Sequence, residues 1–173
     1  MSFLAELNPG QIGLVIGPRA ERLTLLELSA HLALHSPVRV LDGGNSYNAL
    51  YVSRYIRRHT VQLNATLNRI TVARAFTCYQ VVSLLQQTAV SPHPTLILDL
   101  LATFYDESVD LREAHRLRRL APVIVSLRPT PPHQPDRAGL SQPLAKIADH
   151  FLIREPVETA VYQPSLFSER HNG

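Results

Sequence analysis

The stretch IGLVIGPRAERLTLLELSAHLA, residues 12–33, decides the fold because its apolar pattern changes period halfway along. Residues 12–16 form a short, continuous apolar run of strand length. Beyond the turn, Leu25, Leu28 and Leu32 recur at helical spacing on one face. A buried strand followed by a helix is the repeating unit of parallel sheets. The stretch therefore predicts an α/β fold.

The same alternation continues along the chain. Four more apolar runs of strand length are found at residues 38–41, 69–73, 95–98 and 122–127. Because each run is almost continuously apolar, we expect its strand to be buried on both faces, as in a parallel sheet covered by helices. The pattern predicts a three-layer α/β sandwich with a mainly parallel central sheet, folded as one domain over residues 1–163.

Side chains that accept hydrogen bonds from backbone amides mark the expected helix starts. We expect Asn45 or Ser46 to cap a helix that ends near residue 58, and Thr77 to cap one that ends near residue 88. Asp110 is expected to cap a third, ending near residue 120. The Gly43-Gly44 pair before the first of these helices predicts a turn, because glycine adopts positive φ freely.

Two segments depart from this pattern. Residues 128–143 contain five prolines, which predict a loop without regular structure, either functional or disordered. Residues 149–154 and 158–162 are expected to form a terminal pair of antiparallel strands. We expect residues 164–173 to be a flexible tail.

Composition excludes several classes of protein. Of the 173 residues, 45% are hydrophobic and 18% charged, which is typical of a globular chain. No apolar run approaches the roughly 20 residues of a membrane helix, so no membrane contact is expected. The single cysteine, Cys78, excludes an internal disulfide and a cysteine cluster for zinc. These features, with no leader pattern at the start, predict a cytoplasmic protein.

The basic residues are almost all arginine. The chain has 17 lysines and arginines and a formal charge of +3, but Lys146 is its one lysine. The bias is explained by a GC-rich genome or by phosphate recognition through forked guanidinium groups, and both explanations stay open.

Three segments are expected at the carboxyl ends of the strands, where open parallel sheets bind ligands. They are residues 17–24, residues 42–45 and the segment from Asp99 onward. Together with the junction RITVARAF at residues 69–76, they resemble the core of RecA-type recombinases, a P-loop NTPase fold. The resemblance extends over roughly residues 10–155.

The first segment resembles a degenerate phosphate-binding loop. Gly17 and Thr24 match the first glycine and the final threonine of G-x-x-x-x-G-K-S/T. Arg22 replaces the second glycine, and Leu23 replaces the lysine that grips phosphate. In the second segment, Gly44 stands where the family has the glutamate that activates water. Because both catalytic groups are missing, the resemblance implies no competent ATP hydrolysis.

Binding without hydrolysis is a separate question. Thr24 offers a hydroxyl to a metal, and Asp99 matches the aspartate that supports magnesium in the family. Arg19 or Arg22 can replace lysine as a phosphate contact. We expect ATP and Mg²⁺ to bind weakly or not at all; the alternative is a solvated turn whose arginines pair with Glu21 or Glu27.

The strand at residues 122–127 and the proline-rich loop after it resemble the family's DNA-contacting region. The candidate contacts there are Arg128, His133 and Arg137, with no aromatic side chain for base stacking. The other expected loop carries acidic residues, which repel phosphates: Asp106, Glu107 and Asp110. Further arginines lie on predicted helices, including Arg54, Arg57 and Arg58, where a solvated face is the simpler interpretation.

Other chemistry has less support. His31 and His35 have the spacing of two metal ligands on a helix, but no third ligand is evident. Cys78 is interpreted as a packing residue.

The sequence therefore predicts a non-catalytic RecA-like module in DNA repair or recombination. It would act through a protein partner, either a recombinase relative or a second copy, and through DNA. One alternative is an atypical ATPase or nucleotide-binding protein that uses Arg19 or Arg22; another is a nucleotide-responsive, clock-like regulator. Each requires the turn at residues 17–24 to lie at the carboxyl end of a central strand, beside the strand that ends at Asp99.

Overall fold

A six-stranded sheet forms the centre of the molecule in a computed structural model that describes residues 7–8, 10–105, 112–120, 122–129 and 139–155. Its strands are β1 (Ile12–Ile16), β2 (Val38–Asp42), β3 (Ile70–Arg74), β4 (Thr95–Leu98), β5 (Val123–Leu127) and β6 (His150–Ile153). Their order across the sheet is β3-β2-β4-β5-β1-β6, and every neighbouring pair is parallel. The carboxyl ends of all six strands therefore lie at one edge.

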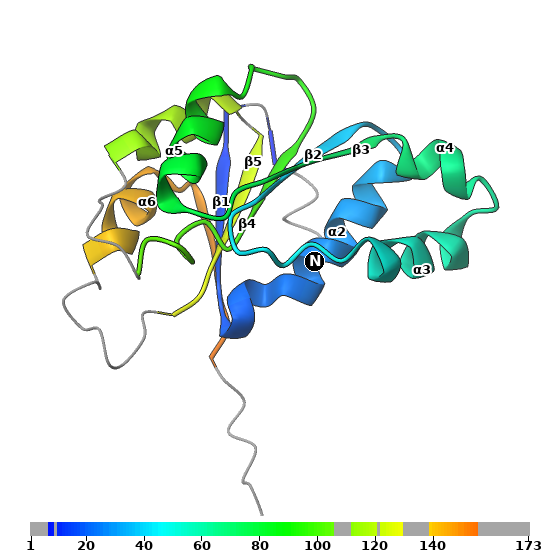
Figure 1. Cartoon of the computed structure of the whole chain (residues 1–173), viewed down its shortest axis with the longest axis horizontal. Helices are drawn as coiled ribbons and strands as arrows, with labels where there is room; N and C mark the ends of the chain where they lie inside the picture. The colour runs from blue at the N-terminus through cyan, green and yellow to red at the C-terminus, as the bar shows by residue number, and fades with distance from the viewer. Residues whose placement is uncertain (1–6, 9, 106–111, 121, 130–138, 156–173) are drawn as a thin grey trace, which may run out of the picture.

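Helices cover the two faces of the sheet (Figure 1). On one face lie α2 (Arg22–Ala33), α3 (Ala49–His59) and α4 (Leu63–Leu67). The opposite face carries α5 (Cys78–Gln87), the 3-10 segment η2 (Arg112–Leu120) and α6 (Gln142–Ile147). The α/β class and the three-layer arrangement predicted from the sequence are confirmed for the described residues.

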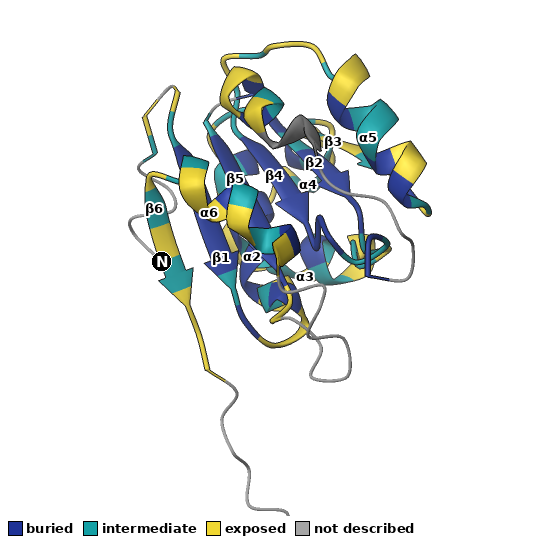
Figure 2. Cartoon of the chain, turned by 90° about the vertical axis from the view of Figure 1, so that its left-hand side faces the viewer, coloured by how far each residue is buried: buried dark blue, intermediate teal, exposed yellow. Residues whose placement is uncertain are grey.

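The core consists of two apolar clusters separated by the sheet. Side chains alternate along each strand, so Leu96 and Leu98 of β4 belong to the cluster under α2, whereas Ile97 belongs to the cluster under α5. The strands β4 and β5 are buried along their whole length, and β1 and β2 at all but one residue, whereas β6 at the edge is half exposed (Figure 2). Burial on both faces explains the continuous apolar runs of β1, β2, β4 and β5. At the other edge of the sheet, β3 has no buried residue, so the expected burial of its run on both faces is wrong.

One local expectation is wrong, and another stays a prediction. The strand near the C-terminus, β6, pairs parallel with β1, and its expected antiparallel pairing with residues 158–162 is not tested because those residues lie outside the described ones. Neither Asn45 nor Ser46 caps α3, because Asn48 accepts the hydrogen bond from the amide of Tyr51 at 2.9 Å. Thr77 caps α5 as predicted.

Two short helices were not predicted. The proline-rich segment ends sooner than expected, since Pro143 lies in the first turn of α6, where its missing amide hydrogen costs nothing. The five residues of α4 are too few to show a helical period. The proposed cap Asp110 and the tail at 164–173 lie outside the described residues. No helix among the described residues is long and apolar enough to span a membrane.

Candidate functional site

The carboxyl edge of the sheet contains a hollow of about 310 Å³. Residues from four separate segments line it: Arg19, Arg22, Gly44, Asn45, Ser46, Asp99 and Arg128. Four of these seven, the three arginines and Asp99, were expected from the sequence as binding residues, whereas Gly44, Asn45 and Ser46 were named there for other reasons. The expected phosphate contacts, Arg19 and Arg22, therefore lie in the same hollow as Arg128, which was expected to contact DNA.

The relative position of the strands differs from the expectation in one respect. The turn that begins at Gly17 does follow β1 at the carboxyl edge, but β1 is not the neighbour of β4. The strand β5 lies between them, and it contributes Arg128 just after its end. The expected direct adjacency of the turn and the Asp99 strand, which the functional hypotheses required, is therefore wrong. A weaker condition holds: the two strand ends share one carboxyl edge and line one hollow, which is the arrangement that a ligand at this edge needs.

The turn itself, η1 (Pro18–Glu21), has an unusual backbone. Arg19, Ala20 and Glu21 have φ of 53°, 54° and 46°, so three successive residues with a Cβ are left-handed. Such a residue costs on the order of 1–2 kcal/mol, and strained residues of this kind cluster at functional sites. Arg22 has φ of −48° and is helical, so this position does not require the glycine of the phosphate-loop motif.

Glu21 folds back into the turn. Its Oε2 accepts a hydrogen bond from the Thr24 hydroxyl at 3.1 Å and pairs with Arg154 at 3.0 Å. A Cβ at Gly17 would lie 2.7 Å from Cγ of Glu21, so a larger residue there would displace the Glu21 side chain from this position. The negative charge at the start of α2 thus comes from the chain itself.

A second hollow, of about 250 Å³, adjoins the turn. Its lining includes Glu21, Thr24 and Arg154, and it shares Arg19 and Arg22 with the first hollow. The Thr24 hydroxyl, expected to face a metal, donates to Glu21. Glu21 pairs with Arg154 rather than with a neighbouring arginine, and Glu27 accepts from the Tyr51 hydroxyl at 2.6 Å.

Asp99 is the buried acid of the first hollow. It is only 2% exposed, and its Oδ2 accepts from Nε of Arg128 at 2.5 Å. Its backbone amide donates to the Ser126 hydroxyl at 3.0 Å, which fixes the end of β4 against β5. Its Oδ1 has no hydrogen-bond partner among the described residues. Burial raises the pKa of Asp99 above its ordinary value, and the Arg128 guanidinium opposes this rise.

Gly43 and Gly44 allow the ends of β2 and β4 to approach each other. A Cβ at Gly44 would lie 2.6 Å from Cβ of Asp99, and one at Gly43 would lie 3.3 Å from the Asp99 carbonyl oxygen. Neither glycine has positive φ, so the expected reason for the pair, conformational freedom, is wrong. Close packing also leaves no space for a glutamate where the family has one.

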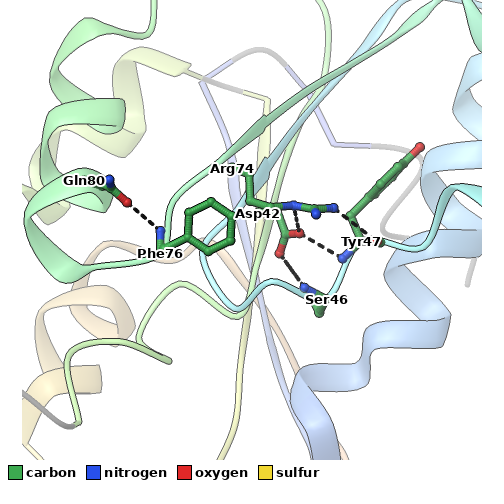
Figure 3. A network of polar contacts seen from close by, with 6 residues as sticks. All are labelled: Asp42, Ser46, Tyr47, Arg74, Phe76 and Gln80. Carbon is green, nitrogen blue, oxygen red and sulfur yellow. Dashed lines mark hydrogen bonds and ion pairs between the residues drawn. The ribbon is translucent and has the colours of Figure 1, made fainter.

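Asp42 holds the loop between β2 and α3 in place. Its buried carboxylate accepts from the amides of Ser46 and Tyr47, each at 2.9 Å, and pairs with Nε of Arg74 at 3.0 Å (Figure 3). Arg74 also donates to the Tyr47 carbonyl oxygen. This network positions Asn45 and Ser46 at the hollow. The sequence placed the segment 42–45 at this edge but singled out neither Asn45 nor Ser46 as a binding residue, because their position at the hollow depends on this loop.

The expected DNA contacts are described only in part. Arg128 is half exposed, whereas His133 and Arg137 lie outside the described residues, as do Asp106 and Glu107. On α3, Arg54, Arg57 and Arg58 are exposed, and the helix contains no acidic residue.

The other candidates contribute no site. The rings of His31 and His35 pack edge to face, and the described residues contain no group of three potential metal ligands. Cys78 is buried in the core, as predicted.

Comparison with known proteins adds no family. No family model matches this sequence, and no curated protein matches it at a significant level. The function must therefore be argued from the α/β fold and the geometry of its carboxyl edge.

Proposed function

We propose that this protein is a non-catalytic RecA-like module that works in DNA recombination or repair by binding a protein partner, and DNA with it. One observation supports the proposed absence of catalysis. The Glu21 carboxylate occupies the turn where a phosphate loop would hold an anion, with the Thr24 hydroxyl and Arg154 bound to it. A polyphosphate entering this turn would meet a negative charge.

The other catalytic positions agree with this interpretation. Leu23, at the lysine position, has a 50% exposed apolar side chain that cannot neutralise a phosphate. Gly44 packs against Asp99 and cannot be replaced by a water-activating glutamate without moving β2 or β4. Phosphoryl transfer needs a cation on the phosphates and a residue that orients water, and neither group stands at its expected position.

A protein partner is favoured by exposed aromatic side chains at the edge of the sheet. Phe76 and Tyr79 are 61% and 68% exposed, where the edge strand β3 leads into α5. Phe76 belongs to the RITVARAF junction that resembles the recombinases most closely. Aromatic side chains are enriched among the residues that dominate protein interfaces.

A second candidate function is the binding of a phosphate-bearing ligand without hydrolysis. The observation that favours it is the convergence of Arg19, Arg22 and Arg128 on one hollow. Guanidinium groups are suited to phosphate oxygens. An atypical ATPase built on this hollow would need a glutamate from a neighbouring subunit.

A phosphate-release assay with ATP and Mg²⁺, with and without single-stranded DNA, tests the lack of catalysis. We expect no release above the buffer rate in either case. Release that is stimulated by DNA and lost in the variant Arg22→Gln would contradict the non-catalytic proposal and support the atypical ATPase.

Binding to a purified catalytic recombinase from the same host tests the partner. We expect the double variant Phe76→Ser/Tyr79→Ser to weaken this binding at least about tenfold, as loss of interface aromatics does. Leu50→Ser is the matched control, because Leu50 is also exposed but lies on α3. If the wild-type chain binds no such recombinase, and purification from the host recovers no protein of DNA metabolism, the proposed partner is wrong.

Gel shifts on single-stranded DNA at increasing salt test the DNA contact. If DNA binds where the resemblance places it, Arg128→Gln should weaken the shift. If DNA instead binds the exposed charge on α3, a combined variant with Arg54, Arg57 and Arg58 changed to Gln should weaken it. Absence of any shift at low salt removes DNA from the proposal.

A further inference from the structure

The segment η1 (Pro18–Glu21) has a sequence suited to a helix but a backbone that is not helical. Proline is favoured at the first position of a helix, and alanine, arginine and glutamate are all good helix formers. Arg22, the next residue, is already helical, with φ of −48°. The sequence therefore favours a helix that runs without interruption from Pro18 into α2. Instead, residues 19–21 have φ between 46° and 54°, a left-handed conformation that disfavours any residue with a Cβ.

The Glu21 side chain holds this left-handed turn in place. Its Oε2 pairs with Nη1 of Arg154 at 3.0 Å and accepts from the Thr24 hydroxyl at 3.1 Å. The Glu21 side chain is only 12% exposed, so salt screens the pair less than it screens an ordinary surface ion pair. A right-handed backbone at Glu21 would point its Cβ in another direction, so the contact with Arg154 depends on the left-handed turn. We call this contact the latch.

Gly17 provides independent evidence for the latch. Its φ of −177° is extended backbone that any residue can adopt, so the backbone does not require a glycine there. A Cβ at Gly17 would nevertheless lie 2.7 Å from Cγ and from Oε1 of Glu21, and the three atoms nearest to it all belong to Glu21. Alanine at this position would therefore push the carboxylate away from Arg154.

The turn can change hand while its ends stay fixed. The φ and ψ of residues 19–21 are close in size and opposite in sign to those of an α-helix. The two forms of the turn are near mirror images and span nearly the same distance, so β1 and α2 need not move apart. The latch opposes the preference of the backbone for the right-handed form, so loss of the latch should change the hand.

We propose that residues 18–21 are a conformational switch. In the closed state, seen in the structure, the turn is left-handed and Glu21 is latched to Arg154; in the open state the segment continues α2 as its first turn and the carboxylate leaves Arg154. Among the described residues that line the second hollow, Glu21 is the one acid, beside Arg19, Arg22 and Arg154. Opening removes this acid, so the obstacle to an anion at the turn is conditional. The switch requires neither a protein partner nor DNA, and its failure would leave the proposed function standing.

Alanine and glycine at position 19 distinguish the two states, because glycine is better tolerated than alanine in a left-handed turn and less well in a helix. Urea unfolding measures the difference. We expect Arg19→Gly to unfold at higher urea than Arg19→Ala in the otherwise wild-type chain. In chains that also carry Gly17→Ala or Arg154→Gln, which open the latch in different ways, the order should reverse. Position 22 is the matched control: it is helical in both states, so Arg22→Gly should unfold at lower urea than Arg22→Ala in every chain.

Nuclear magnetic resonance of the wild type and the two opening variants observes the backbone directly. Positive φ brings the amide and Hα protons of one residue close together, so residues 19–21 should show strong intraresidue contacts in the wild type. In the opening variants these should weaken, and contacts between residues three apart, typical of a helix, should begin at Pro18. The same order of stability at position 19 in all chains, or a left-handed turn that persists in both opening variants, would overturn the proposal. Either opening variant suffices if the other does not fold.

Discussion

Gly44 shows how a single missing side chain shapes this edge of the sheet. Because a Cβ there would lie 2.6 Å from Cβ of Asp99, we expect Gly44→Ala to lower the free energy of unfolding by about 1–3 kcal/mol, as overpacking does. Gly139→Ala is the control, since its Cβ would meet no atom within 4 Å. Urea unfolding measures both. Equal midpoints for the two variants would show that β2 and β4 can separate without cost.

Asp99 gives the protein a pH-dependent stability. Its pKa is raised in the folded state, chiefly by burial, above the ordinary value of 3.8. At pH values between the ordinary pKa of 3.8 and the raised pKa of the folded state, the folded state binds more protons than the unfolded state, so stability falls as pH rises. The full penalty is reached above the folded pKa, and each tenfold difference in proton affinity between the two states contributes about 1.4 kcal/mol to it. Asp99→Asn cannot ionise and escapes this penalty.

Urea unfolding of both proteins at a series of pH values upward from about 4 measures this effect. The free energy of unfolding of the wild type, minus that of Asp99→Asn, should decrease with rising pH and then become constant. A difference that increases with pH would mean that Arg128 lowers the pKa of Asp99 more than burial raises it.

Some site residues could be predicted from the spacing of the sequence motif, and others could not. The motif register found Arg19, Arg22 and Asp99, because strand ends in a parallel sheet meet at one edge. The roles of Glu21 and Gly44 depend on left-handed backbone and on close packing between strands. No spacing rule encodes these properties, so the occupied turn could be found only from the structure.

At the scale of the element, the apolar runs predicted five of the six strands as parallel. Burial on both faces explains the pattern of the four inner strands, but not that of the edge strand β3, which has no buried residue. The parallel pairing of β6 with β1 was not predicted, because the half-exposed edge strand alternates between intermediate and exposed residues, and alternation does not encode direction. The strand order was also beyond reach, since β5 inserts between β1 and β4. Long-range pairing of this kind leaves no local signal.

The start of α3 provides a test at this scale. Asn48 accepts the amide hydrogen of Tyr51, so Asn48→Ala should lower the free energy of unfolding by about 1 kcal/mol. Ser46→Ala serves as the control, because the Ser46 hydroxyl makes only a 3.4 Å contact with Asp42, and its amide contact survives the change. Thermal melting of both variants measures the effect. If Ser46→Ala lowered the free energy of unfolding more than Asn48→Ala, Ser46 would be the cap, as expected from the sequence.

At the scale of the whole molecule, the two core clusters share one sheet. Adjacent residues of the same strand point into different clusters, as Leu14 and Val15 of β1 do. Loss of either cluster exposes one face of every central strand and removes the support for the other cluster. We therefore expect the described residues to unfold as one cooperative unit, although the chain exceeds the size at which two-state unfolding is the rule.

Two truncations, one on each face, test this cooperativity. Leu28→Ala in α2 and Leu85→Ala in α5 remove buried side chains from opposite clusters, and each should cost about 2–5 kcal/mol. Urea unfolding followed by far-ultraviolet circular dichroism and by tyrosine fluorescence should give coincident curves that shift to lower urea in both variants. Tyr51 and Tyr55 report on the α2 face, and Tyr105 reports on the α5 face. If Leu85→Ala shifted only part of the curve, the two faces would unfold separately, and the shared sheet would not couple the two clusters.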